Sequence, residues 1–374
     1  MENKNIELLK ATIYVIIGII LFFFVIIIAK QILIPISLSF LFATLIYPLT
    51  WLLQEKLKFP RTVAVLVGVL TFVALIFVFF NLLINQISNL AQDFPELKEK
   101  ALANLEYLRL FVQENFGVDS ESQHSWMRDR IKGLFESGSS LLENMINATA
   151  GTLFQLLLIP VLMYYMLSFR EQFRKFVIIV SPKKKREDTE KIMKDISTII
   201  QRYISGVFTV VIILGFLNSI GLYIIGLKYA VIFGVLSALF NLIPYFGTWI
   251  GAFFPITFAL LTGDSPSLAI SVFLFYAIIQ FTENNILTPN ITGGYVRLNP
   301  LITILSIIVG GIVWGITGML IVIPFMATLK ILFEQVDDLK PLAYLIGNER
   351  KKKWRVVLKR VRRSMGLTGQ GKQK

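Results

Sequence analysis

Eight stretches of this 374-residue chain contain no aspartate, glutamate, lysine or arginine, and their lengths constrain its fold more than any other feature. They cover residues 11–29, 31–54, 62–92, 144–169, 203–227, 229–263, 265–282 and 300–329. An α-helix needs about 20 predominantly apolar residues to cross the hydrocarbon core of a bilayer. Only 16% of the residues are charged, against roughly a quarter in soluble domains. The sequence therefore predicts an all-α polytopic membrane protein with about eight transmembrane helices.

The distribution of basic residues predicts which ends of these helices face the cytoplasm. Segment 169–203 carries ten Lys or Arg residues and the tail 334–374 carries twelve, as the positive-inside rule expects of cytoplasmic segments. We therefore expect the chain to lie in a prokaryotic cytoplasmic membrane, with both termini in the cytoplasm. The predicted divisions are transmembrane helices 1–3 in residues 1–87, an extracytoplasmic domain in 88–147, a fourth span in 148–169, a basic cytoplasmic loop in 170–202, a C-terminal transport core in 203–335 and a basic tail in 336–374.

The extracytoplasmic segment is expected to be helical. It holds six basic and ten acidic residues, and Ile87, Leu90, Phe94, Leu97 and Ala101 follow the steps of three and four that place side chains on one helix face. A simple helical hairpin that continues the third span and returns to the fourth explains this pattern. A gate or an oligomer contact is the functional alternative.

Two polar, proline-containing breaks interrupt the apolar C-terminal half, at residues 241–251 and 280–300. Proline removes a backbone donor and ends or kinks a helix. Discontinuous helices of this kind expose backbone groups to polar solutes and ions in transporters, so the C-terminal half is predicted to contain broken or re-entrant helices. The alternative is that both breaks are turns at the cytoplasmic surface of the membrane, where polar residues need no special explanation.

Glu283 is the leading single candidate, because it is the only acidic residue between Asp264 and Glu334 and it ends an uncharged span. Ionisable groups near membrane depth are costly and typically mark ion or proton paths. Glu283 could pair with Arg297 and lock the break, or it could take up and release a proton during transport. The predicted substrate or ion pathway comprises Asn241, Pro244, Tyr245, Gly247, Glu283, Asn284, Asn285, Pro289, Gly293, Arg297, Asn299 and Pro300.

Two further groups of residues have predicted mechanical roles. A bent hairpin that returns the chain to its starting side is expected from the hinge and packing residues Gly310, Gly311, Gly315, Gly318 and Pro324. In residues 351–363, eight of thirteen are Lys or Arg, with apolar residues at helical spacing, which is typical of a helix lying on anionic lipid. The predicted lipid-surface residues are Lys351, Lys352, Lys353, Trp354 and Arg355.

The composition also limits cofactors and partners. There is no cysteine and one histidine, His124, so neither a thiolate site nor a His-rich metal cage is expected, and no cofactor is predicted. The net charge of +13 is concentrated beside apolar spans, so we expect membrane lipids and no nucleic acid as partners. No nucleophile–base pair or phosphate-binding loop is visible, so the chain is not predicted to be an enzyme. Transport is expected to use an ion gradient, with H⁺ and Na⁺ as the candidate coupling ions, or to run downhill.

Several motifs in the second half resemble the autoinducer-2 exporter (AI-2E) family. They are Gly226-Leu-Lys-Tyr-Ala-Val, Asn241-Leu-Ile-Pro-Tyr-Phe-Gly, Glu283-Asn-Asn-Ile-Leu-Thr-Pro and Gly315-Ile-Thr-Gly-Met-Leu, in the family's order. Thr248 departs from the pattern, because family members often carry proline there. The resemblance implies an eight-span transporter that forms homo-oligomers, with pentamers as the first expectation. It also implies either export of a small polar solute such as the quorum-sensing molecule autoinducer-2, or exchange of Na⁺ or Li⁺ for protons, and the sequence leaves both open.

Overall fold

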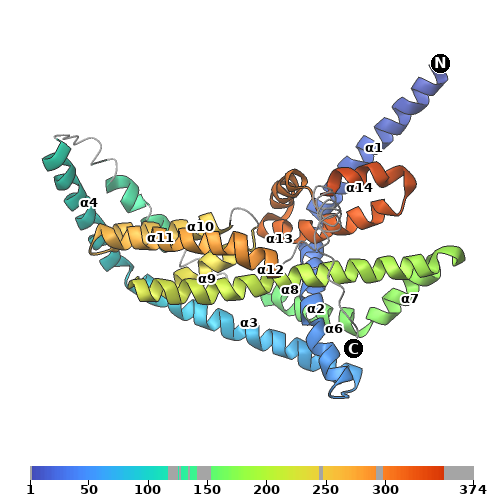
Figure 1. Cartoon of the computed structure of the whole chain (residues 1–374), viewed down its shortest axis with the longest axis horizontal. Helices are drawn as coiled ribbons and strands as arrows, with labels where there is room; N and C mark the ends of the chain where they lie inside the picture. The colour runs from blue at the N-terminus through green and yellow to red at the C-terminus, as the bar shows by residue number, and fades with distance from the viewer. Residues whose placement is uncertain are drawn as a thin grey trace, which may run out of the picture. The chain divides into compact units, whose positions relative to one another are not determined.

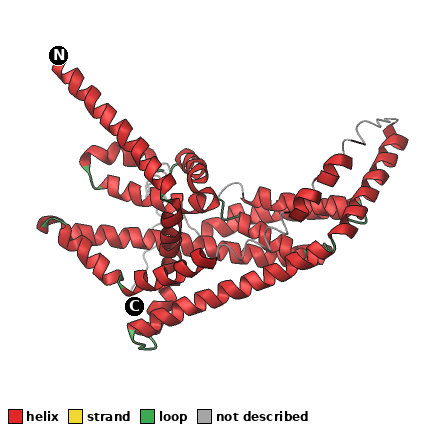
Figure 2. Cartoon of the chain, turned by 180° about the vertical axis from the view of Figure 1, so that it is seen from behind, coloured by secondary structure: helices red, strands yellow, loops and turns green. Residues whose placement is uncertain are grey.

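The computed structural model describes residues 2–116, 125, 128–133, 135–140, 153–243, 247–291 and 298–348. Over these residues the chain forms helices and no strand (Figure 2), apart from an isolated antiparallel bridge between Leu298 and Gly347. The all-helical prediction is confirmed. Pro244, Tyr245, Gly293, Arg297, His124 and the predicted lipid-surface residues of the tail, Lys351 to Arg355, lie outside the described residues.

Figure 1 shows the helices of the described residues in chain order. They are α1 (Glu2–Ile28), α2 (Lys30–Glu55), α3 (Arg61–Gln92), α4 (Phe94–Phe116), α6 (Leu153–Ser168), α7 (Arg170–Val180), α8 (Arg186–Ile225), α9 (Ala230–Phe240), α10 (Gly247–Thr262), α11 (Pro266–Thr282), α12 (Thr288–Ile291), α13 (Pro300–Glu334) and α14 (Lys340–Ile346).

Among the described residues, five helical stretches are long and apolar enough to cross a membrane, namely Lys30–Glu55, Arg61–Gln92, Arg186–Ile225, Pro266–Ile291 and Pro300–Glu334. Shorter apolar helices occur at Ile13–Ile28, Leu157–Ser168, Ala230–Phe240 and Gly247–Thr262. Each of the five exceeds the roughly 20 residues that a bilayer core requires. The chain is therefore a multi-pass membrane protein, while the count of eight spans stays a prediction.

The chain divides into two compact units, and the larger one consists of Ser39–Arg170 and Ile204–Gly293. Part of its core joins α2, α3 and α6, where Ala43, Val65 and Met163 are buried against one another. Gly68 permits the close approach of α3 to α2, because a Cβ there would lie 2.6 Å from Thr50 Cγ2. Lipid provides no hydrophobic driving force for helix association, so membrane helices depend on close packing, which small residues at the contacts permit.

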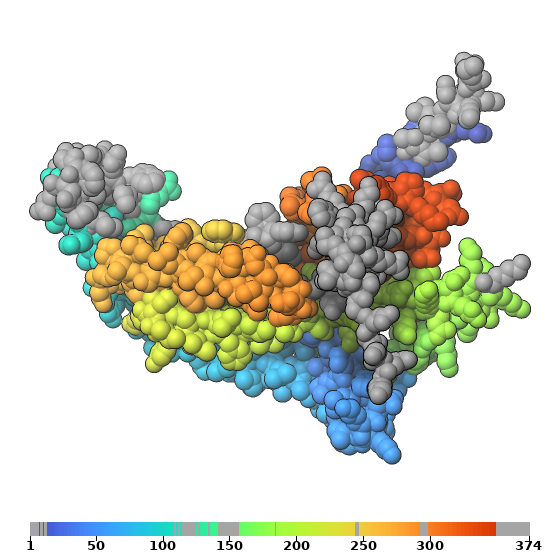
Figure 3. Space-filling view, viewed as in Figure 1, coloured from blue at the N-terminus to red at the C-terminus, as the bar shows by residue number. Residues whose placement is uncertain are grey.

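The rest of this unit is a bundle of α8, α9, α10 and α11. Leu214 of α8, Ala238 of α9 and Ile279 of α11 share one buried cluster. Figure 1 shows α9, α10 and α11 side by side, and Figure 3 shows the orange α11 lying against the yellow-green second half of α8. A helix is present in segment 88–147 as α4, and Asn104 Nδ2 ties it to the α10–α11 turn by donating to Leu261 O at 2.9 Å and Gly263 O at 2.8 Å.

At the position of the first predicted break, the structure has two short helices. α9 ends at Phe240 and α10 begins at Gly247, so the uncharged block 229–263 folds back on itself. Gly251 allows the two helices to touch, because a Cβ there would lie 2.7 Å from Ser237 Cα. Neither helix alone, at 11 and 16 residues, reaches the length of a full span.

The second break takes a different form from the one predicted. The helix does not end near Thr282 but continues through a five-residue π turn, Glu283–Leu287, into α12. Thr288 N–H bonds to Glu283 O, five residues back, so the turn is wider than an α-helical one. We attribute the continuity to this wider turn, which places Pro289 in a new first turn where a missing donor costs little. π turns are rare and are often found at functional sites.

The smaller unit consists of Met1–Leu38, Glu171–Tyr203 and Gly294–Lys374. Its α13 is bent where predicted, because Trp314 and Gly315 leave helical geometry and Gly315 has a φ of +61° that favours glycine. A Cβ on Gly310 would lie 2.6 Å from Gly318 O, so the two arms of the bend are in contact. The 35-residue apolar stretch is thus two arms, and length alone overstates it as a single span.

Candidate functional site

Glu283 lies at the start of the π turn, and its side chain is enclosed by three segments of the larger unit. The residue is only 6% exposed. Asn241 Nδ2 donates to Oε1 at 2.8 Å, and Thr248 Oγ1 donates to Oε2 at 2.6 Å. Each carboxylate oxygen therefore has one neutral donor. Within the described part of the chain Glu283 forms no ion pair, and its predicted partner Arg297 lies outside that part.

The α9–α10 connection brings these two donors together. Asn241 is the C-cap of α9, and Thr248 is the second residue of α10. Gly247 makes the close turn possible, because a Cβ there would lie 2.5 Å from Asn241 Cα. The positive end of the α10 dipole also lies beside Thr248 and favours a carboxylate there. Thr248 and Asn241, which precede Glu283 by 35 and 42 residues, thus both donate to its carboxylate.

The Thr248 hydroxyl has a choice of acceptors. Its Oγ1 lies 2.6 Å from Glu283 Oε2 and 3.2 Å from Asn241 Oδ1. A hydroxyl carries one proton and can donate to only one of them at a time. The shorter contact to a carboxylate is the stronger hydrogen bond. A protonated Glu283 could instead donate to Thr248 and leave the hydroxyl proton for Asn241.

A second buried polar cluster lies further along the same helices. Tyr276 OH donates to Ser237 Oγ at 2.8 Å, and Ser237 Oγ donates to Gly251 O at 2.6 Å. Ser237 is four residues before Asn241, and Gly251 is three residues after Thr248, which places each pair on one helix face. Hydrogen-bonding groups therefore extend through the interior of α9, α10 and α11 in two successive layers.

At the C-terminal end of α3 in the same unit, Asp93 joins α3 to the α8–α9 turn. Lys228 Nζ lies 2.7 Å from Asp93 Oδ2, and the Tyr229 hydroxyl donates to the same oxygen. The hydrogen bond from Lys228 holds the pKa of Asp93 below its ordinary value, and the same bond raises the pKa of Lys228. Tyr229 has a φ of +63°, an uncommon conformation for a non-glycine residue. Asp93 lies directly after α3, and Lys228 and Tyr229 lie between α8 and α9, so all three are outside the apolar helices.

The other predicted site residues have mixed locations. Asn284, Asn285 and Pro289 are exposed, and Asn285 Nδ2 donates to Phe281 O of its own helix at 2.8 Å. In the smaller unit, Asn299 caps α13 by accepting from Leu301 N, and Pro300 is the first residue of that helix. None of these five side chains donates a described hydrogen bond to Glu283, so its described donors are Asn241 and Thr248.

Sequence reasoning did not identify Thr248, Ser237 or Tyr276 as members of this region. Thr248 was visible only as a departure from the proline expected after Gly247. Ser237 lies one helical turn before Asn241, and a polar side chain repeating at that spacing inside an apolar block was the available signal.

Long apolar helices around a buried, hydrogen-bonded carboxylate are typical of multi-pass membrane transporters. Comparison with known proteins agrees. The family model described as "AI-2E family transporter" matches residues 16–338, and the chain therefore belongs to the AI-2E family of transporters.

Its relatives carry names of the same kind. "Putative transport protein YrrI" of Bacillus subtilis strain 168 is 30% identical over 310 residues, which cover 81% of this chain and 86% of the relative. "Putative transport protein YueF" of the same strain is 27% identical over 76% of this chain and 79% of its own. "Putative permease PerM" of Escherichia coli K12 is 26% identical over 57% of this chain and 60% of its own.

Proposed function

We propose that this transporter exports a small polar solute resembling autoinducer-2 across a prokaryotic cytoplasmic membrane, with Glu283, Asn241 and Thr248 on its path. The chain is a carrier in this proposal and not an enzyme. The observation that carries it is a carboxylate, 6% exposed, whose two oxygens are both held by neutral donors. An ionisable group among membrane helices is costly and is typically retained for a substrate or proton path.

Proton coupling would follow from the arrangement of donors. When Glu283 is charged, Asn241 and Thr248 stabilise it through hydrogen bonds of 2.8 Å and 2.6 Å. When Glu283 takes up a proton, those donors become available for the hydroxyl groups of a polyol. Neutral side chains suit a solute without fixed charge, because they satisfy its hydrogen bonds without binding it as an ion.

The proposal extends to orientation and assembly. We place both termini in the cytoplasm, because the basic segment 169–203 and the basic tail flank apolar helices. The separate arms of α13 and the broken α9–α10 pair would serve as re-entrant elements. Homo-oligomers, with five subunits as the first choice, are proposed from the resemblance to the family alone.

Exchange of Na⁺ or Li⁺ for protons is the second candidate, and one observation favours it. Glu283 Oε2, Thr248 Oγ1 and Asn241 Oδ1 gather three side-chain oxygens, with Thr248 Oγ1 2.6 Å and 3.2 Å from the other two. Hard cations take oxygen ligands of this kind. The same carboxylate would bind the cation and the proton alternately.

Purified protein in proteoliposomes distinguishes the two candidates. One set of vesicles is loaded with autoinducer-2 or a related furanone polyol and assayed for efflux at pH 6 and pH 8. A second set contains no solute and reports proton movement after a Na⁺ pulse. Solute efflux above that of protein-free vesicles, together with no Na⁺-driven proton movement, is the expected result. Proton movement without solute efflux would favour antiport and refute export. The absence of both activities would refute both candidates.

A further inference from the structure

α7 (Arg170–Val180) carries an apolar face that no described residue of the smaller unit covers. Phe173, Phe176, Val177 and Val180 recur at steps of three, four and seven, which places them on one side of the helix. These four residues are between 40% and 67% exposed, and no residue of α7 is buried. An exposed apolar stripe of this kind marks a surface that contacts a membrane or another protein.

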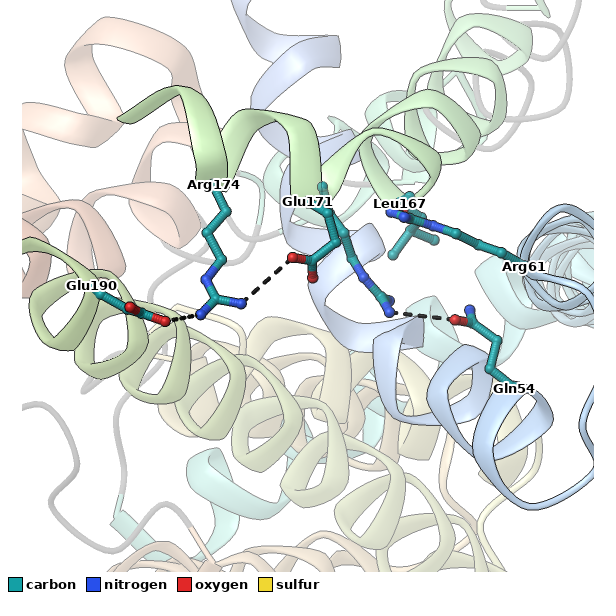
Figure 4. A network of polar contacts seen from close by, with 7 residues as sticks. Gln54, Arg61, Leu167, Glu171, Arg174 and Glu190 are labelled. Atoms are coloured by element: carbon teal, nitrogen blue, oxygen red, sulfur yellow. Dashed lines mark hydrogen bonds and ion pairs between the residues drawn. The ribbon is translucent and has the colours of Figure 1, made fainter. Parts of the chain in front are cut away.

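The position of α7 along the chain places its start at a membrane boundary. Only Phe169 separates α7 from the end of the apolar α6. At that end, Arg61 Nη2 donates to Leu167 O at 3.0 Å, and Arg170 Nη2 donates to Gln54 Oε1 at 3.4 Å (Figure 4). Charged and polar side chains thus gather where α2 and α6 end and α3 begins. An 11-residue helix is about 16 Å long, too short to enter and cross a core of about 30 Å.

The opposite side of α7 is already occupied by protein contacts. Arg174 forms ion pairs with Glu171 of α7 and Glu190 of α8, which Figure 4 shows converging on its guanidinium group. Arg186 Nη2 also donates to Ile179 O at 3.3 Å. These contacts fix the rotation of α7 against the start of α8. The apolar stripe is therefore left facing away from this helix pair.

The charge around α7 favours lipid over a second copy of the chain. Segment 169–203 contains ten basic and five acidic residues, and the exposed Lys175, Lys183 and Lys185 lie in or just after α7. The anionic cytoplasmic leaflet attracts juxtamembrane lysine and arginine. Two copies meeting through this segment would instead bring like charges together, which is unfavourable.

We infer that α7 is an interfacial anchor, with its apolar stripe among the lipid acyl chains and its neighbouring lysines on anionic headgroups. This surface goes beyond the transport site, because it fixes the chain where α6 leaves the bilayer and before α8 enters it. Amphipathic helices with basic flanks bind membranes in this way. The basic character of this segment was visible in the sequence, but the free apolar face was not.

The absence of cysteine in the chain allows a direct test on the full-length protein. Phe173→Cys, Phe176→Cys and Val180→Cys each carry one spin label on the stripe. Glu187→Cys, on the exposed first turn of α8, is the matched control. The proteins are reconstituted in vesicles of phosphatidylglycerol and phosphatidylcholine, and the collision rates of the label with oxygen and with a water-soluble nickel chelate are compared.

The three stripe labels are expected to collide with oxygen severalfold more than with nickel, and the control label is expected to show the reverse. Nickel access equal to that of the control would place the stripe in water and overturn the inference. Low access to both reagents would show a protein covering, such as a second copy, and would overturn it equally. In phosphatidylcholine alone, nickel access at Phe176→Cys should rise at least twofold, and an unchanged value would remove the role of anionic headgroups.

Discussion

Replacing Thr248 by valine would change the Glu283 site with almost no change in volume. Valine keeps the branched shape and removes the hydroxyl that donates to Glu283 Oε2 at 2.6 Å. Asn241 still holds Oε1 at 2.8 Å. The substitution therefore removes one of two described donors to the carboxylate and tests whether that hydrogen bond sets the protonation step of transport.

The size of the effect follows from the strength of such bonds. A hydrogen bond to an ionised group contributes about 1.5–3 kcal/mol, and about 1.4 kcal/mol changes an equilibrium constant tenfold. A transport step that depends on this hydrogen bond should therefore change by roughly 10- to 100-fold when the donor is lost. The profile of transport against pH should therefore differ from that of the unaltered protein.

The assay is solute or proton flux in proteoliposomes between pH 5 and pH 9, with two control variants. Thr248→Ser keeps a hydroxyl and should retain the original pH dependence. Thr262→Val removes a hydroxyl of α10 that donates to Phe258 O of its own helix and should leave the profile unchanged. Identical profiles for Thr248→Val and the unaltered protein would refute a role for this hydrogen bond in coupling.

Three further predictions concern stability. Gly310→Ala should lower the free energy of unfolding by about 1–3 kcal/mol, because the added Cβ would lie 2.6 Å from Gly318 O. The control Gly18→Ala has open space around the added Cβ and should leave stability unchanged. Thermal unfolding in nanodiscs measures both effects. Ser237→Ala leaves a buried hydroxyl and a carbonyl unpaired and should cost about 1–3 kcal/mol in the same assay. The lowered pKa of Asp93 means that its stabilising contribution is present above the ordinary aspartate value and is lost as pH falls through the lowered one. Asp93→Asn should therefore remove part of the acid sensitivity of unfolding below about pH 4, and an unchanged acid profile would contradict this assignment.

The fold was largely predictable because the length of a stretch without charged residues indicates whether it can form a membrane-spanning helix. The separation of α9 from α10 followed from a 35-residue block that was too long for one span and that held a polar, proline-containing break. The bend of α13 followed from clustered glycines, and it occurs at Gly315. Both features depend on local chemistry, which a single sequence records.

The site was less predictable because its partners are set by packing between distant segments. Glu283 was identified from its isolation among apolar residues, but Thr248 joins it only through the α9–α10 turn. The π turn was missed because Pro289 predicted an end to the helix, whereas a wider turn accommodates it. Asn284 and Asn285 were grouped with Glu283 by sequence position, yet helical geometry points neighbours in different directions.

The most direct test of a coupling role for Glu283 is the pH dependence of transport by Glu283→Gln in proteoliposomes. Glu96→Gln serves as the matched control, because it makes the same substitution at an exposed position in the first turn of α4. We expect Glu283→Gln to remain folded and to lose proton-coupled flux, while Glu96→Gln keeps it. A folded Glu283→Gln protein with the flux and pH profile of the unaltered transporter would contradict the assignment of Glu283 to the transport path.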